Sequence, residues 1–274
     1  MIFSNPPLVE LVAELRWVPG VDRTAAPPQP QGGNLGLQVG TIQFPLTSPY
    51  QEEIFSRFSN HVAAKGFVIS ERLVPSGFPA LLFTVVYRFR KPSPTGENYL
   101  YQIGPGLFSA NALPPYRNWD SFRPIVQEGI QALLDSRHPT EAVPFTSIKL
   151  GYIDLFTAEF TEGKRSFRFL NDVLGVKLEL PNTLKEQISD IDGVQAGVHL
   201  AMPLRNGLVM NLNFQDGIVA GKSGILMSTE VLAIQPTPPD ISQIMQTLEN
   251  AHTHIRATFL GLTEKLSAKM LPVQ

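Results

Sequence analysis

The chain of 274 residues contains no cysteine and few charged side chains. The absence of cysteine excludes disulfide bonds, thiol nucleophiles and thiolate ligands for metal ions. Charged residues make up 17% of the chain, below the roughly 25% that is typical of globular proteins. A surface with so few charges is typical of a protein that is partly covered, so we expect a protein partner or self-association.

Long apolar runs and basic segments are also missing. No apolar run approaches the roughly 20 residues that a membrane-spanning helix needs. Residues 1–20 begin with alternating apolar and polar side chains and include Glu10 and Glu14, unlike a signal peptide. The net charge of -2 gives no basic surface for nucleic acid. We therefore expect a cytoplasmic protein with no membrane contact and no nucleic-acid partner.

Residues 103–134 carry the most informative pattern of the chain. A strand ends in the Gly-Pro-Gly turn at 104–106, a second strand follows, and a Pro-Pro turn at 114–115 leads into a helix. Asp120 or Ser121 should cap this helix, which would place Pro124 in its first turn. Its apolar stripe is Phe122, Ile125, Val126, Ile130, Leu133 and Leu134.

The remaining pattern predicts an α+β protein made of two similar halves. Helices are predicted at 49–65, 121–135 and 240–260, and strands at 8–17, 67–73, 81–89, 99–103, 147–160, 193–202, 208–214 and 225–234. Asn206-Gly207 and Asp216-Gly217 predict hairpin turns. Residues 1–140 and 141–274 would each follow a β-α-β-β-β-α plan. Each half would be an antiparallel sheet covered by a long helix, and the halves would pack side by side.

The opening N-P-P-L-V-E-L-V-A-E-L-R-W at 5–17 resembles a sporadically distributed, uncharacterised bacterial family, whose members begin with an a-P-i-V-E-a-v-x-E-i-R-f pattern. Residues 102–122, 150–154 and 248–264 resemble further stretches of that family in the same order. Members often read Arg-Tyr-Ile-Asn where this chain has Gly-Tyr-Ile-Asp at 151–154. The resemblance implies no reaction, cofactor or substrate. The patchy distribution is similar to that of mobile or defence-associated genes.

The sequence contains no complete motif for catalysis, a cofactor or a metal ion. Residues 217–223 resemble a phosphate-binding loop, but three residues separate the glycines instead of four, and a strand pattern follows where a helix is required. His252 and His254 are two residues apart, so on one helix they face different directions and cannot form a zinc pair. We expect His252 to be hydrogen-bonded, in the core or where the halves meet. No catalytic, cofactor-binding or metal-ligating residue is assigned.

Two groups of side chains are candidates for interaction. Asn111, Tyr116 and Trp119 concentrate polar and aromatic groups near the turns, and they form a possible recognition surface. The alternative is that Trp119 docks the helix against the Gly-Pro-Gly turn, which we favour. Asp154 lies in an apolar strand and needs a partner if it is buried. Arg16, or otherwise Arg88, could form a buried ion pair with it.

These observations leave three functional hypotheses. We favour a non-catalytic binding or accessory protein in a bacterial multi-protein system, for example in defence against phage or mobile elements. A chaperone-like binder of apolar segments would instead expose apolar patches. A metal-independent hydrolase or nuclease would gather Asp154, Glu10 or His252 in one concave pocket. The sequence therefore favours binding over catalysis without deciding between them.

Overall fold

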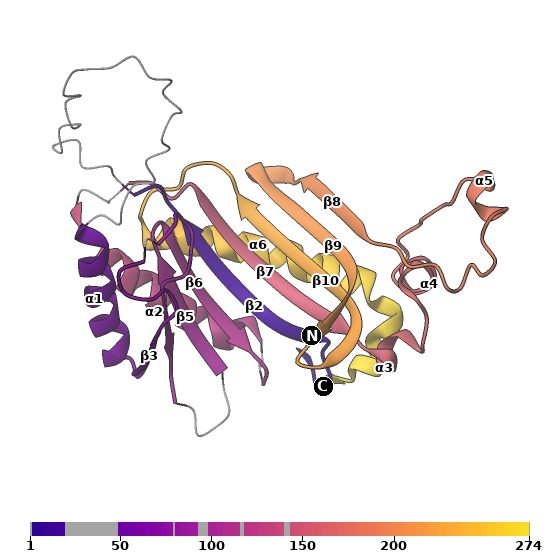
Figure 1. The fold of residues 1–274 in the computed structure, drawn as a ribbon, viewed down its shortest axis with the longest axis horizontal. Helices are drawn as coiled ribbons and strands as arrows, with labels where there is room; N and C mark the ends of the chain where they lie inside the picture. Colours follow the sequence, from indigo (N-terminus) through magenta and orange to yellow (C-terminus); the bar gives the residue numbers. More distant parts are fainter. Residues whose placement is uncertain are drawn as a thin grey trace, which may run out of the picture.

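The computed structural model describes residues 2–19, 49–78, 80–92, 98–115, 118–139 and 143–273. Within these ranges, nine strands form one antiparallel sheet in the order β3-β4-β5-β6-β2-β7-β10-β9-β8 (Figure 1). These strands are β2 (Leu8–Arg16), β3 (Ile69–Arg72), β4 (Tyr87–Arg90), β5 (Asn98–Gly104), β6 (Leu107–Leu113), β7 (Ser147–Phe156), β8 (Val198–Pro203), β9 (Leu208–Val219) and β10 (Lys222–Ala233). The two ends of the described chain also pair, as β1 (Ile2–Phe3) and β11 (Pro272–Val273).

Three long helices lie on one face of the sheet. They are α1 (Pro49–Ala64), α2 (Trp119–Ser136) and α6 (Ile241–Leu262). Figure 1 shows α6 behind the sheet, running across the strands of the second half of the chain. Shorter helical segments are α3 (Ala158–Thr161), α4 (Ser166–Arg168), a π-helical turn (Phe169–Val173), α5 (Asn182–Lys185) and α7 (Ser267–Met270). Among the described helices, none combines the length and the apolar composition of a membrane-spanning helix.

The core fills the space between the sheet and these helices. Side chains alternate between the two faces of a strand, and in β2 the buried side chains are Leu11, Ala13 and Leu15. These side chains pack in one cluster with Phe122 and Ile130 of α2 and with buried residues of α1 and α6. Sequence periodicity therefore identified the face of α2 that is buried.

The α+β class and the antiparallel sheet agree with the sequence, but the plan of two separate sheets is not confirmed. β2 and β7 lie on either side of the expected boundary at residue 140. They pair along their length, from Leu8 opposite Asp154 to Arg16 opposite Ser147. One sheet therefore runs through both predicted halves. Strands from before the boundary occupy one end of this sheet, and strands from after it occupy the other.

The first turn of α2 differs from the prediction in its cap. Asn118 is the N-cap, because its side chain accepts a hydrogen bond from the Ser121 backbone and the Ser121 side chain accepts one from the Asn118 backbone. The helix therefore begins at Trp119, earlier than the sequence indicated, and Pro124 falls in its second turn. This shift makes Trp119 the first helical residue and directs its indole toward α6.

The two predicted hairpins have different outcomes. Asn206 and Gly207 have φ values of 71° and 72° and connect β8 to β9, as the Asn-Gly signal predicted. The turn predicted at Asp216-Gly217 is wrong. β9 continues through Gly217, which pairs with Gly224, and the chain reverses at Ala220 and Gly221. The residues that resemble a phosphate loop therefore belong to two paired strands and the turn between them.

Candidate functional site

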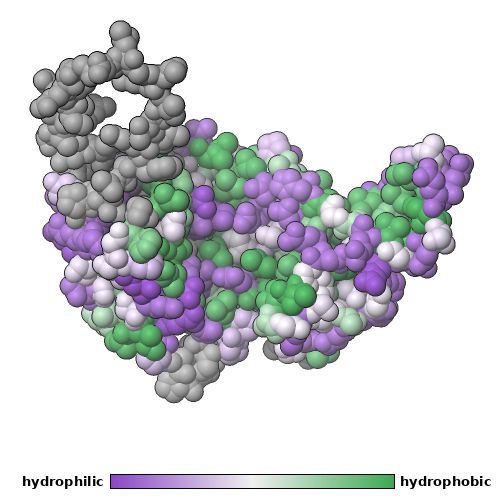
Figure 2. Space-filling model, viewed as in Figure 1, coloured by the Kyte–Doolittle hydropathy of each residue, from purple (hydrophilic) through white to green (hydrophobic). Residues whose placement is uncertain are grey.

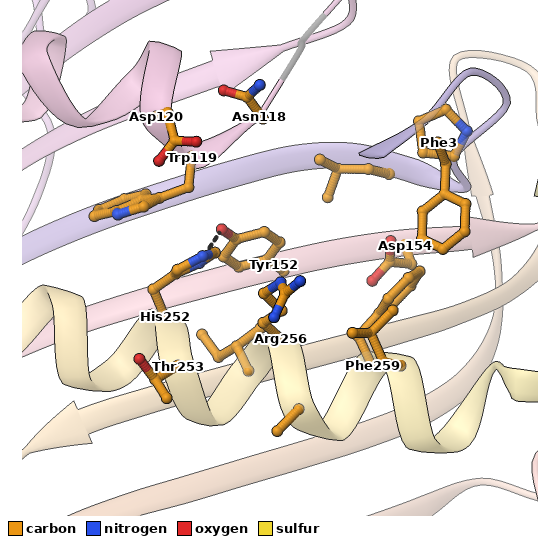
Figure 3. A pocket seen from close by; sticks show the side chains of 15 residues that line it. Phe3, Asn118, Trp119, Asp120, Tyr152, Asp154, His252, Thr253, Arg256 and Phe259 are labelled. Atoms are coloured by element: carbon orange, nitrogen blue, oxygen red, sulfur yellow. Dashed lines mark hydrogen bonds between the residues drawn. The ribbon is translucent and has the colours of Figure 1, made fainter. Parts of the chain in front are cut away.

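The described surface contains a groove of about 650 Å³ between α6 and the strands β2 and β7 (Figure 3). The beginning of α2 lines one part of it, and β1 lines another. The lining residues are Phe3, Pro6, Leu8, Asn118, Trp119, Asp120, Tyr152, Asp154, His252, Thr253, Ile255, Arg256, Ala257, Phe259 and Leu260. This volume is within the roughly 300–1,000 Å³ range of small-molecule sites. Eight of these fifteen residues are apolar, and the polar ones come from β7, from α6 and from the start of α2.

Asp154 is the most unusual polar group of the groove. Its residue is 2% exposed, and its neighbours on the adjacent strands are Leu8 and Met227, which cannot pair with a carboxylate. No other described residue forms a hydrogen bond or an ion pair with its carboxyl group. Burial raises the pKa of Asp154 from 3.8 to about 8, because the apolar surroundings disfavour the charged form. The carboxyl group is therefore mostly neutral at pH 7.

His252 is a second polar residue of the groove, and it contacts two aromatic side chains. The Tyr152 hydroxyl lies 2.9 Å from Nδ1 of His252, and the Trp119 ring stacks on the imidazole with 5.2 Å between centroids (Figure 3). Burial lowers the pKa of His252, and the nearby Glu249 carboxylate offsets this effect only in part. The prediction that His252 is hydrogen-bonded is confirmed, and its ring joins α6 to both α2 and β7.

Trp119 is held in place by α6 rather than by the Gly-Pro-Gly turn. Its residue is 4% exposed, and its Nε1 donates a hydrogen bond of 3.0 Å to Glu249. Arg123 of α2 also donates to the Glu249 carboxylate. The docking role of Trp119 is supported, but the expected contact surface is wrong. The turn at 104–106 precedes β6, whereas α2 follows the other end of that strand.

The charged side chains at the rim of the groove are exposed. Asp120 lies at the start of α2, and Arg256 lies one helical turn after His252 on α6. Figure 3 shows Arg256 between His252 and Phe259, on the side of α6 that faces β7. Arg256 forms no hydrogen bond or ion pair with another described residue. The groove thus has a buried carboxyl group in its wall and an exposed guanidinium group at its rim.

The possible recognition surface is not assembled as proposed. Asn111 is 5% exposed and lies on the sheet face opposite the helices, where it donates to Glu10 and interacts with Ser109. Trp119 lies on the helix-covered side, against α6. Asn111 alternates with Ala110 and Ala112, which are buried under the helices, so the two candidates cannot share a surface. Tyr116 lies outside the described residues.

The possible buried ion pair between Asp154 and Arg16 is wrong. The two residues occupy opposite ends of the β2–β7 ladder, because Asp154 is opposite Leu8 and Arg16 is opposite Ser147. Arg16 instead pairs with Glu14 at 2.8 Å on the other face of the sheet. Arg88, the second partner considered, pairs with Glu71 at 3.3 Å. The strand register, which sequence alone does not supply, decides these pairings.

Sequence reasoning missed the groove residues Tyr152, Arg256 and Phe259. Two spacings could have found some of them. Tyr152 and Asp154 are two residues apart on a strand, and His252 and Arg256 are four apart on a helix, so each pair shares a face. The sequence could not show that these two faces lie opposite each other.

The part of the chain that the structure describes holds no cluster of three or more side chains suited to bind a metal ion. No protein-family model matches the chain, and comparison with curated proteins gives no match either.

Proposed function

We propose that the protein is a non-catalytic binding protein and that its ligand occupies the groove between α6 and β7. The observation that carries the proposal is Asp154, a buried carboxyl group in the groove wall without a described partner. A buried polar group without a partner destabilises the folded chain by roughly 1–3 kcal/mol. A ligand that pairs with this group would remove that cost when it binds.

The arrangement of His252 favours binding over catalysis. Tyr152 occupies one ring nitrogen, and Trp119 covers one face of the imidazole. The ring therefore serves as a fixed wall between α2 and β7. We further propose that the protein works with other proteins in a bacterial system, and defence against phage or mobile elements is part of this proposal. Its support is the low charged fraction and the resemblance of residues 5–17.

A six-carbon probe set tests the binding function. We expect at least one of hexylamine, 1-hexanol and hexanoate to bind the purified protein in isothermal titration calorimetry. Ala257→Trp should abolish binding, because Ala257 lines the groove and an indole there would fill it. Gln246→Trp is the matched control, since Gln246 is exposed on the same helix outside the groove. Failure of all three probes, or binding that survives Ala257→Trp, would contradict the proposed function.

One observation favours a hydrolase as a second candidate. Asp154 and His252 line the same groove, as the enzyme hypothesis required, whereas Glu10 lies on the other face of the sheet. An acyl ester such as p-nitrophenyl hexanoate tests this alternative. We expect no turnover above the buffer rate. Turnover that His252→Gln abolishes would replace the binding function with a catalytic one.

A different observation favours the chaperone-like candidate. Several apolar side chains between residues 68 and 82 are exposed, including Val68 at 62% and Phe78 at 67%. Figure 2 shows apolar surface at the end of the molecule that holds α1 and β3. Suppression of aggregation of an unrelated unfolded protein tests this candidate. Suppression that Phe78→Ser removes would support it.

A further inference from the structure

Asp154 is the only buried carboxylic acid among the described residues. All other described Asp and Glu side chains are at least partly exposed, and many form ion pairs or hydrogen bonds with other described residues. Asp154 is 2% exposed and has no described partner, and its side chain lines a groove wide enough for a small molecule. In the unliganded protein, the Asp154 carboxyl group therefore lacks a hydrogen-bond or ion-pair partner among the described residues.

The side chains around Asp154 limit which ligands can reach its carboxyl group. Figure 3 shows Phe3 and Phe259 beside the carboxyl group, and their rings contact each other with 6.2 Å between centroids. Leu8 is its neighbour on β2. A ligand that pairs with the carboxyl group must therefore have an apolar chain that contacts these side chains and a polar head group at the end of that chain.

We propose that the groove binds a small aliphatic primary amine, whose ammonium group pairs with the Asp154 carboxylate and whose chain lies along Phe3, Leu8 and Phe259. This inference rests on the proposed binding function and adds the chemical class of the ligand. A hydrogen bond between ionised partners is roughly twice as strong as one between neutral partners. The carboxyl group is almost fully buried in the folded protein, so the ligand meets a prearranged partner that carries little water.

The other charged groups of the groove act more weakly on the ligand. Arg256 on α6 and Asp120 on α2 are exposed, so solvent and salt screen their charges. Tyr152 and His252 are hydrogen-bonded to each other, and burial lowers the pKa of His252, which favours the uncharged ring. On the adjacent strands, Leu8 and Met227 carry no charge. Among the described lining residues, Arg256 at the solvent-exposed rim is the only cationic side chain that an anionic ligand could meet.

Binding of an amine must release a proton from Asp154. At pH 7 the empty site is mostly a neutral carboxylic acid, and the bound site is a carboxylate beside an ammonium group, so the proton passes to the buffer. With a pKa of about 8, about nine-tenths of a proton leaves per ligand at pH 7. The amine stays charged up to about pH 10. Amine affinity should therefore rise about tenfold from pH 7 to pH 9.

The relative affinities of the three six-carbon probes, which differ only in their head groups, test the inference. At pH 8.5 we expect hexylamine to bind at least about tenfold more tightly than 1-hexanol or hexanoate. Asp154→Asn keeps the shape of the side chain, and it should weaken hexylamine binding by about thirtyfold or more and leave 1-hexanol binding unchanged. Asp135→Asn is the matched control, because it removes an exposed carboxyl group of α2 that lies outside the groove. Its amine affinity should stay within about threefold of the wild type. Calorimetry in two buffers of different ionisation enthalpy measures the released proton.

Several results would overturn the amine assignment. Equal affinity for hexylamine and 1-hexanol would refute it and leave the proposed function standing, as would tightest binding of hexanoate. Binding of none of the probes would refute both. A large gain of amine affinity in Arg256→Gln, on the order of tenfold, would show that Arg256 occupies the carboxylate in solution and that Asp154 is not an open partner.

Discussion

The buried carboxyl group of Asp154 should make the stability of the protein depend on pH. In the unfolded chain this group has a pKa of about 3.9. In the folded chain burial raises its pKa to about 8. Between these two values the folded state binds a proton that the unfolded state has released. The free energy of unfolding therefore falls as pH rises through this window.

The size of the effect follows from the two pKa values. A full proton difference changes the free energy of unfolding by about 1.4 kcal/mol per pH unit. Between pH 5 and pH 7 the difference is close to one proton, so Asp154 should lower stability by roughly 3 kcal/mol across that interval. Below about pH 3 and above about pH 9 the contribution of Asp154 should no longer change with pH.

Urea unfolding of the wild type and of Asp154→Asn at pH 5, 6, 7 and 8 measures this effect. The variant carries a neutral side chain of the same shape, so its advantage over the wild type should grow with pH. Burial also lowers the pKa of His252, which makes stability fall toward acid pH. That contribution is present in both proteins and cancels in their difference. A difference in unfolding free energy that stays constant from pH 5 to pH 8 would refute the reasoning.

Two further predictions concern helix packing. Trp119→Ala should lower the free energy of unfolding by about 3–5 kcal/mol, because the buried indole and its hydrogen bond to Glu249 are both lost; a variant that melts like the wild type would contradict the docking role. Gly129→Ala should destabilise by about 1–3 kcal/mol in urea unfolding, since its Cβ would lie 2.5 Å from the ring of Tyr101. A Cβ at Gly261 would have no atom within 4 Å, so Gly261→Ala should instead raise the free energy of unfolding by about 0.5–1 kcal/mol. A change of the same sign in the Gly129 and Gly261 variants would contradict this prediction.

Local patterns predicted the helices well because helix signals depend on neighbouring residues. The stripe of α2, the helix predicted at 240–260 and the Asn206-Gly207 turn each follow from residues within a few positions. The strand predicted at 81–89 shows the limit of such patterns. Its first part leaves the sheet, with Phe83 at a φ of 64°, and only β4 remains. Tertiary contacts override strand propensity there.

Strand pairing depends on residues that are far apart in sequence, and sequence reasoning failed there. β2 and β7 were assigned to separate sheets, although they are adjacent in a single one. The same error produced the wrong partner for Asp154, because Arg16 lies at the far end of the shared ladder. The sequence did identify Asp154 as a charge that needs explanation. Its groove could not be anticipated without the β2–β7 register and the position of α6.

The location of the groove connects ligand binding to the stability of the whole sheet. Leu8 and Trp119 come from before residue 140, whereas Asp154 and His252 come from after it. The groove therefore exists only when β2 is paired with β7 and α2 is packed on α6. A ligand that binds there selects this assembled state and stabilises it by mass action. The unpaired carboxyl group of Asp154 weakens the fold at the junction where a bound ligand would strengthen it.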